Sequence, residues 1–336
     1  MMSRKPRVLV TCDMDERLRM GVCAVLEPAC TVSFLKDCAE AERSGAIQES
    51  DALLCFFFNK EIRPEEYPLL EKMRLLQTIS TGVDFLPFAD IPSGLPIACN
   101  AGGWASQIAE HTVAMILALS RRLLPLHEEL RRGRFHKEEP VLRTLRGKIA
   151  GIIGYGGIGK RVADLLRAFG MKTAAINSSG KTKDDVVFCG TLDDLATMLS
   201  MSDVVVLSLP LMRHTRHVIG KRELEAMKPD AIFVNVARAH LVDEEALYEH
   251  CRANADFSAG IDVWWKEPTW GGGDFTLRFP FLDLPNVLGS PHNSNSAEDG
   301  FAEASIAAAG NVACFLRGDP YSGRVDRKDY AENASD

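Results

Sequence analysis

Residues 149–160 read Ile149-Ala150-Gly151-Ile152-Ile153-Gly154-Tyr155-Gly156-Gly157-Ile158-Gly159-Lys160. An apolar run of strand length leads into three glycines spaced as G-x-G-x-x-G, and a helical pattern follows to residue 169. In this setting Gly154 permits a tight turn, Gly156 lets the backbone approach a pyrophosphate, and Gly159 lets the helix pack closely on the strand. The amides and positive dipole end of the helix favour an anion. We therefore predict a dinucleotide site on residues 154–159, with a nucleotide-based methyl donor as the main alternative ligand.

The residue that hydrogen-bonds the cofactor's ribose is expected 18 positions beyond the last glycine, at the end of the strand that follows the glycine motif. NAD-specific sites usually carry Asp or Glu there, whereas this chain has Asn177, followed by Ser178 and Ser179. A missing carboxylate removes the repulsion that a 2′-phosphate would meet, and the hydroxyls with Lys181 and Lys183 can bind that phosphate. NADP is therefore the favoured cofactor. NAD is the alternative, because Asn177 can instead hydrogen-bond an unmodified ribose.

The glycine motif lies within a longer alternation of apolar runs and helical patterns. Strands separated by helices indicate βαβ units and parallel sheets, so the sequence predicts an α/β fold with two Rossmann-like or flavodoxin-like domains. The expected strands of the first part are Arg7–Val10, Val32–Leu35, Ala52–Phe58, Leu75–Ile79 and Ile97–Cys99. Those of the second are Ile149–Gly154, Lys172–Asn177, Val186–Phe188, Val204–Leu209, Ala231–Val236, Ser258–Asp262 and Asn286–Leu288.

Two long helical patterns stand out beside these strands. One covers residues 104–124, where Pro125 is expected to end or kink it, and the other covers residues 298–316. The charged stretch 128–146 mixes both signs, which indicates a solvated arm or a dimer contact. The last 16 or so residues are polar, and we expect them to fray.

Composition excludes several classes of protein. A chain of 336 residues suggests two domains, and 46% apolar with 25% charged residues is ordinary globular usage. A net charge of −7 gives no general reason to bind nucleic acid, and no apolar run approaches the length of a membrane span. The nine cysteines form no Cys-x-x-Cys pair, which favours reduced thiols, a cytoplasmic location and no metal site.

Three segments downstream of the glycine motif each place a reactive side chain just after a strand. Residues 233–238 end in an arginine, residues 260–268 contain a Glu-Pro pair, and residues 288–294 place a histidine beyond the strand. The carboxyl ends of the strands are where an open parallel sheet builds its ligand crevice. The order and position of these segments point to one composite site.

With these motifs the sequence resembles the D-isomer-specific 2-hydroxyacid dehydrogenase family, which includes glyoxylate/hydroxypyruvate reductases and phosphoglycerate dehydrogenases. The resemblance covers nearly the whole chain. Further matching segments are Thr81-Gly82-Val83-Asp84, Asn100–Gly103, Ile108–His111, the long segment from Leu207–Pro210 through Met227–Pro229, and Val242–Leu247.

The resemblance implies three catalytic residues whose chemistry suits a 2-oxo acid. Arg238 offers a planar guanidinium to the substrate carboxylate. Reduction of the carbonyl needs a proton donor that works near neutral pH, which is a property of histidine side chains and suits His292. Glu267 can hydrogen-bond the imidazole and keep it protonated. The substrate would thus contact Arg238 and His292, with backbone donors from Thr81, Gly82 and Val83.

The resemblance also completes the cofactor site, with Asp262 beside the nicotinamide. The residues that it adds to the glycine motif and to Asn177, Ser178 and Ser179 are Leu209, Pro210, Ala237, Arg238, Asp262 and His292.

The implied organisation is a discontinuous substrate domain of residues 1–99 and 294–336 and an NAD(P)-binding domain of residues 100–293. The helix over residues 104–124 would join the two domains, and a homodimer would form around it. Hinge closure of the domains over the crevice would exclude water before hydride transfer. The leading function is hydride transfer between a nicotinamide cofactor and a small 2-oxo or D-2-hydroxy acid, of glyoxylate or hydroxypyruvate type. The alternatives are a dinucleotide-sensing protein of corepressor type and, more weakly, a formate or phosphite dehydrogenase.

Other conspicuous residues have simpler interpretations. His214 and His217 have metal-pair spacing but basic neighbours, so we expect a loop and no metal. His111 is expected to be structural, and the remaining histidines, His127, His136, His240 and His250, are expected at the surface. The aromatic run 56–58 is either a pocket wall or core, and the glycine-rich insert 269–279 is expected to alter the rim of the cleft.

Overall fold

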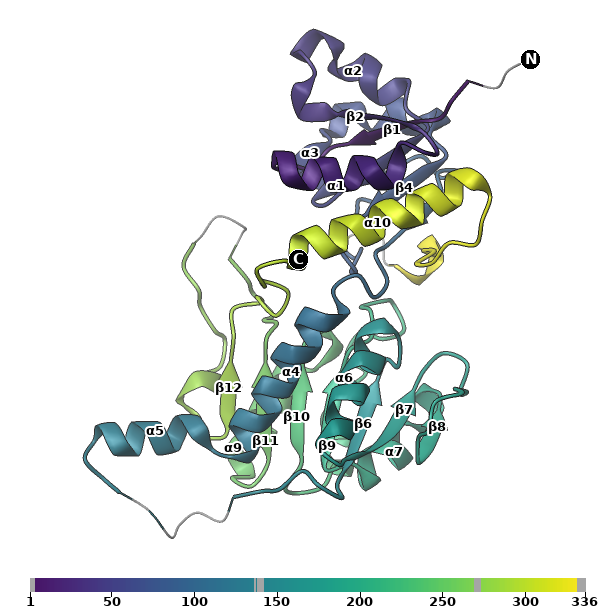
Figure 1. Cartoon of the computed structure of the whole chain (residues 1–336). Helices are drawn as coiled ribbons and strands as arrows, with labels where there is room; N and C mark the ends of the chain where they lie inside the picture. Colours follow the sequence, from purple (N-terminus) through teal and green to yellow (C-terminus); the bar gives the residue numbers. More distant parts are fainter. Residues whose placement is uncertain (1–3, 136, 138–141, 269–272, 331–336) are drawn as a thin grey trace. The chain divides into compact units, whose positions relative to one another are not determined.

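A computed structural model describes residues 4–135, 137, 142–268 and 273–330. Each of its two sheets consists entirely of parallel strands, which confirms the predicted α/β class. The chain forms two compact units, one of Met1–Trp104 with Ala297–Asp336 and one of Ala105–Ser296 (Figure 1). One unit therefore takes both ends of the chain.

The unit of residues 105–296 holds a seven-stranded sheet in the order β12-β11-β10-β9-β6-β7-β8. Its strands are β6 (Ile149–Ile153), β7 (Lys172–Ile176), β8 (Phe188–Gly190), β9 (Val204–Leu207), β10 (Ile232–Asn235), β11 (Ser258–Ile261) and β12 (Val287–Gly289). The strand order reverses between β6 and β9, so their carboxyl ends form the topological switch point at which such sheets bind ligands.

The same unit also contains helices. They are α4 (Ala105–Ser120), α5 (Leu123–Arg131), α6 (Gly157–Ala168), α7 (Leu195–Met201), α8 (Lys221–Ala226) and α9 (Glu244–Ala253), with 3₁₀ segments at Leu192–Asp194, Ala239–Leu241 and Phe281–Asp283. Helices α4 and α6 pack on each other and on the sheet (Figure 1). Helix α8 contacts both α7 and α9. All four residues of β9, β10 and β11 are buried, as expected for strands covered on both faces.

The other unit has a five-stranded sheet in the flavodoxin-like order β2-β1-β3-β4-β5. Its strands are β1 (Arg7–Val10), β2 (Thr31–Phe34), β3 (Ala52–Cys55), β4 (Leu75–Thr78) and β5 (Ile97–Ala98). Its helices are α1 (Glu16–Leu26), α2 (Glu40–Gln48), α3 (Phe58–Glu61) and α10 (Gly300–Arg317), with 3₁₀ segments at Leu35–Asp37, Pro64–Lys72 and Arg327–Asp329. Helix α10 contacts α1, β3 and β4, which joins the C-terminal part of the chain to this unit.

The helix expected over residues 104–124 is two helices, and Pro125 is not the residue that divides them. Helix α4 ends at Ser120, and Arg122 has φ 49° and ψ 40°, which is left-handed backbone. Pro125 lies in the first turn of α5, where an amide has no intrahelical acceptor and proline is tolerated.

The third strand is also shorter than expected, since β3 stops at Cys55 and Phe58 begins α3. The Glu61 carboxylate accepts hydrogen bonds from the amides of Phe56 and Phe57, the latter at 2.6 Å, and so turns the chain out of the sheet. Phe58 is fully buried and belongs to the core, whereas Phe56 is half-buried. Strand β8 likewise lies two residues beyond the expected Val186–Phe188.

The structure also shows the surroundings of the histidines and cysteines. The surface assignment of His250 is wrong, because its ring is half-buried, its centroid lies 4.5 Å from that of Phe257, and burial lowers its pKa. His136 lies outside the described residues. All nine cysteines carry free thiols. Within the described ranges, no helix has both the length and the apolar composition needed to cross a bilayer.

The segment 321–330 is ordered, so the expectation of fraying is wrong there; residues 331–336 lie outside the described residues. The Arg327 guanidinium donates to the carbonyls of Phe88, Ile91, Pro92 and Leu95 at 2.7–3.3 Å. The partners lie more than 230 residues away, where a local sequence pattern gives no sign of them.

We expect Arg327→Ala to lower the free energy of unfolding by about 1–3 kcal/mol, because it leaves half-buried carbonyls without their donor. The neighbouring exposed Lys328 provides the matched control, and Lys328→Ala should stay within about 0.5 kcal/mol of the parent. Urea unfolding measures both variants. Equal midpoints for the two would contradict the structural role of Arg327.

Candidate active site

The glycine loop follows β6 and is shaped by close contacts. Gly154 has φ +96°, and a Cβ there would stand 2.5 Å from the amide nitrogen of Leu209. A Cβ on Gly159 would stand 2.4 Å from the carbonyl oxygen of Gly154. At Gly156, in contrast, no described heavy atom lies within 4 Å of the Cβ position, and no side chain caps α6 there. The loop thus fits a pyrophosphate, which could approach Gly156 and the first amides of the helix.

The loop after β9 lies on the other side of the switch point. The Ser208 hydroxyl donates to the Gly154 carbonyl at 3.0 Å, which joins the two loops. The buried Thr215 hydroxyl donates to the Pro210 carbonyl at 2.9 Å and accepts from the Met212 amide at 2.7 Å. Leu209 and Pro210 are therefore held in a defined turn beside the glycine loop.

The loop that begins at Asn177 is organised by its own side chains. The Asn177 Oδ1 accepts from the amide and the hydroxyl of Ser179 at 3.0 and 3.1 Å, and its Nδ2 donates to the Lys181 carbonyl at 2.9 Å. Ser178, Ser179 and Lys181 are exposed. Both ends of the Asn177 amide thus serve the loop, and the exposed hydroxyls and amine face solvent.

One carboxylate near this loop is matched by a cation. The Lys160 amine lies 3.2 Å from Asp184 and, with the Thr182 hydroxyl, holds the pKa of Asp184 below its usual range. Asp184 is therefore an ion-pair partner of α6.

Arg238 follows β10, where the buried Asn235 side chain shapes the turn. The Asn235 Nδ2 donates to the Arg238 carbonyl at 3.0 Å, and its Oδ1 accepts from the Ala237 amide at 3.1 Å. The Arg238 guanidinium donates to the Ala237 carbonyl at 2.8 Å. Asn235 was not singled out from the sequence, although its place at the end of a strand run is a usable signal.

His292 and Glu267 are brought into direct contact. The Nδ1 of His292 lies 2.7 Å from Oε2 of Glu267, and the Trp264 amide donates to the other carboxylate oxygen at 2.8 Å. Burial raises the pKa of Glu267, but the bond and charge of His292, the Trp264 amide and the charge of Arg238 outweigh it, so the pKa lies below its usual range. The carboxylate is thus kept charged, and each of the two side chains is one-third exposed.

Asp262, at the end of β11, holds the loop that carries His292. Its side chain is fully buried. Its backbone carbonyl accepts from the His292 amide at 2.7 Å, and its carboxylate accepts from the amides of Asn293 and Ser294 at 3.2 and 3.3 Å. Strands β10, β11 and β12 are neighbours, so Arg238, Glu267 and His292 all lie at one edge of the sheet.

The Thr81–Val83 segment belongs to the other unit. The Thr81 hydroxyl donates to the Asn100 carbonyl at 3.1 Å, Val83 is buried, and Thr81 and Gly82 are half-buried. Trp104 donates from its indole to the Ile79 carbonyl at 2.8 Å and so supports the same turn.

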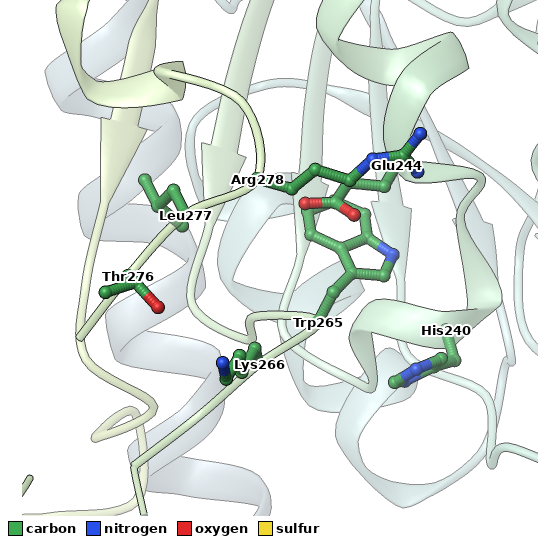
Figure 2. A pocket seen from close by; sticks show the side chains of 7 residues that line it. All are labelled: His240, Glu244, Trp265, Lys266, Thr276, Leu277 and Arg278. Carbon is green, nitrogen blue, oxygen red and sulfur yellow. The ribbon is translucent and has the colours of Figure 1, made fainter. Parts of the chain in front are cut away.

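A recess of about 420 Å³ lies in the larger unit, and its lining residues are close in sequence to the predicted catalytic residues. Figure 2 shows the side chains that line it. Its lining residues are His240, Glu244, Trp265, Lys266, Thr276, Leu277 and Arg278. Arg238, Glu267 and His292 are not among the described residues that line this recess. Residues 269–272 of the predicted insert lie outside the described residues, so its effect on the cleft rim stays a prediction.

The described residues contain no group of three or more His, Cys, Asp or Glu residues arranged to hold a metal ion. His214 and His217 are exposed in an irregular segment, and His217 has φ 53°.

Comparison with known proteins places these features in one family. The model of the D-isomer specific 2-hydroxyacid dehydrogenase NAD-binding domain matches residues 113–294. A glycerate dehydrogenase of Methylorubrum extorquens is 31% identical over 266 residues, 77% of this chain and 81% of that protein. A glyoxylate reductase of Thermococcus litoralis is 28% identical over 329 residues, 94% and 95% of the two chains.

A solved structure supports the fold. The D-isomer specific 2-hydroxyacid dehydrogenase from Xanthobacter autotrophicus Py2, solved with NADPH and MES, superposes with a TM-score of 0.77 at 24% identity, covering 98% of this chain and all of the other. Together with the glycine loop and the parallel sheets, these matches show that the chain belongs to the D-isomer specific 2-hydroxyacid dehydrogenase family and is an oxidoreductase that uses a nicotinamide cofactor.

Proposed function

We propose that the chain interconverts a small 2-oxo acid and its D-2-hydroxy acid, with glyoxylate and hydroxypyruvate as the favoured oxo acids. The observation that carries this proposal is the 2.7 Å contact between His292 and Glu267 at the sheet edge that also bears Arg238. Relatives named glyoxylate reductase and hydroxypyruvate reductase support the choice of substrate.

His292 is assigned the proton transfer. Its Nδ1 is committed to Glu267, so Nε2 is the nitrogen that exchanges a proton with the substrate oxygen. The charged Glu267 stabilises the imidazolium form, and the bound nicotinamide supplies the hydride when an oxo acid is reduced. His292 donates its proton in that direction and recovers it from the hydroxyl group in the reverse one.

We assign to Arg238 the binding of the substrate carboxylate. A guanidinium offers two parallel donors that match the two carboxylate oxygens, which fixes the orientation of the acid as well as its charge. The amides of Thr81, Gly82 and Val83 are assigned further donation to the same carboxylate, as the family resemblance implies. Orientation of the carbonyl toward His292 follows from holding the carboxylate.

NADP is the cofactor that the loop after β7 favours. Position 177 lacks the carboxylate of an NAD-specific site, and the exposed Ser178, Ser179 and Lys181 offer hydroxyls and a cation to a 2′-phosphate. The nearby Asp184 is already paired with Lys160, which reduces its repulsion of a phosphate.

A cytoplasmic homodimer is the state that we assign to the enzyme. On helix α5 the side chains of Leu123, Leu124 and Leu130 are 57, 51 and 54% exposed, and apolar side chains exposed together are typical of a protein contact. The nine free thiols suit a reducing compartment.

The first test is a panel of glyoxylate, hydroxypyruvate, pyruvate and bulkier 2-oxo acids, each with NADH and NADPH in a spectrophotometric assay. We expect at least one of the small acids to be reduced. The alternative, a dinucleotide sensor, predicts that no acid oxidises either cofactor although NADPH still binds.

His292→Ala should lower kcat by about 100-fold or more, as expected for the loss of a general acid, while NADPH binding is retained. His127→Ala, which removes an exposed histidine on α5, is the control and should leave kcat unchanged. Steady-state kinetics with the best acid of the panel measure both. A near-parental rate for the His292 variant would remove it from the mechanism.

Lys181→Gln should lower kcat/KM for NADPH about tenfold and leave the value for NADH nearly unchanged, because it removes one charge-assisted bond to the 2′-phosphate. Lys172→Gln, at the exposed start of β7, is the matched control. The parent enzyme should prefer NADPH. A strong preference for NADH, or an equal loss with both cofactors, would refute the phosphate site.

A further inference from the structure

His111, on α4, reaches the loop that carries His292. Its Nε2 lies 2.9 Å from the Ser290 hydroxyl oxygen and 3.7 Å from Oδ1 of Asp262. The Ser290 hydroxyl oxygen in turn lies 2.6 Å from Oδ1 of Asp262. Since α4 packs on β10, β11 and β12, three polar side chains from three elements meet at the sheet edge that bears His292.

The direction of each hydrogen bond between His111, Ser290 and Asp262 can be assigned by counting donors and acceptors. Asp262 accepts from the amides of Asn293 and Ser294, so both of its oxygens face donors. Two oxygens 2.6 Å apart need one proton between them, and the Ser290 hydroxyl supplies it to the carboxylate. The Ser290 oxygen is then left as an acceptor, which requires a hydrogen on Nε2 of His111. The order of donation is His111 to Ser290 to Asp262.

The backbone at His292 shows why this order matters. His292 has φ +50°, a left-handed conformation that disfavours residues with a Cβ and persists only when its surroundings hold it. Its amide donates to the backbone carbonyl of Asp262, and the amides of Asn293 and Ser294 donate to the Asp262 carboxylate. Successive amides beside a left-handed residue can converge on an anion, and here the amides of Asn293 and Ser294 converge on the buried Asp262 carboxylate. The orientation of that carboxylate therefore determines where the His292 loop lies.

We propose that His111 is a positioning residue for His292, acting through Ser290 and Asp262. Its Nε2–H fixes the Ser290 hydroxyl, the hydroxyl fixes the Asp262 carboxylate, and the carboxylate holds the left-handed turn that aims the imidazole. The catalytic consequence rests on the proposed role of His292 as proton donor. The hydrogen-bond chain itself stands on the geometry alone.

The central experiment compares two amides at position 111. Glutamine places its NH₂ near the position of a histidine Nε2, whereas asparagine places it near Nδ1 and cannot reach Ser290. His111→Asn should lower kcat about 10- to 100-fold, the range expected when a reacting group is misplaced by about 1 Å. His111→Gln should restore most of the rate. Equal rates in the two variants would overturn the proposal, and thermal unfolding of both checks that they remain folded.

A double-mutant cycle tests the route through Ser290. If His111 acts only through that hydroxyl, then His111→Asn combined with Ser290→Ala should cost no more in kcat than the larger single loss. Ser290→Thr, which keeps the hydroxyl, should retain activity. If the two losses in kcat multiply in the double variant, the two residues act independently, and the proposed route from His111 through Ser290 is overturned.

Nitrogen-15 NMR of histidine-labelled protein separates this proposal from the proposed function. We expect Nε2 of His111 to carry a proton in the parent, and the His292 ring signals to shift in His111→Asn but not in His111→Gln. An unprotonated Nε2 on His111, or His292 signals that do not shift in either variant, would overturn the positioning role even if turnover is normal. If no oxo acid is reduced by the parent, the proposed function fails while these signals still decide the positioning role.

Discussion

All the strands of the larger sheet run in the same direction, and the arrangement of the site follows from this constraint. A parallel sheet brings the carboxyl ends of its strands to one edge, so segments far apart in the sequence meet there. The loop 154–159 after β6, Arg238 after β10, Glu267 beyond β11 and His292 after β12 all occupy that edge. The strand order reverses between β6 and β9, which is the place where sheets of this kind bind ligands. Each functional group therefore stands just beyond a strand, and none needs a long excursion of the chain.

A buried carboxylate then gives that edge its detailed shape. Removing Asp262 from water is unfavourable unless hydrogen bonds replace those of the solvent, and its three donors come from Ser290, Asn293 and Ser294. The loop must curl around the carboxylate to deliver its amides, and the left-handed turn at His292 results. Family resemblance assigns Asp262 to the nicotinamide, and the structure adds a second task that can be performed from the same position. A substitution there would change the geometry of proton transfer as well as any cofactor contact.

The sequence predicted the features that local patterns determine. The parallel α/β architecture follows from apolar runs alternating with helical patterns, and the glycine spacing identified the loop after β6. The boundary of β3 was missed because the side chain of Glu61 takes up the amides of Phe56 and Phe57. The order of residues 321–330 was missed because Arg327 bonds to carbonyls more than 230 residues away. A local window contains neither partner, and the same holds for the contact of His111 with Ser290.

The charges of the site respond to the substrate that we propose. Burial raises the pKa of Glu267, and it stays below its usual range because His292 and Arg238 contribute positive charge. Arg238 therefore acts on Glu267 in addition to the substrate contact that we propose for it. An anionic acid bound at the guanidinium, as we propose, would offset part of the positive charge that holds the Glu267 pKa low. Substrate binding and the charge state of Glu267 are therefore coupled through the same guanidinium.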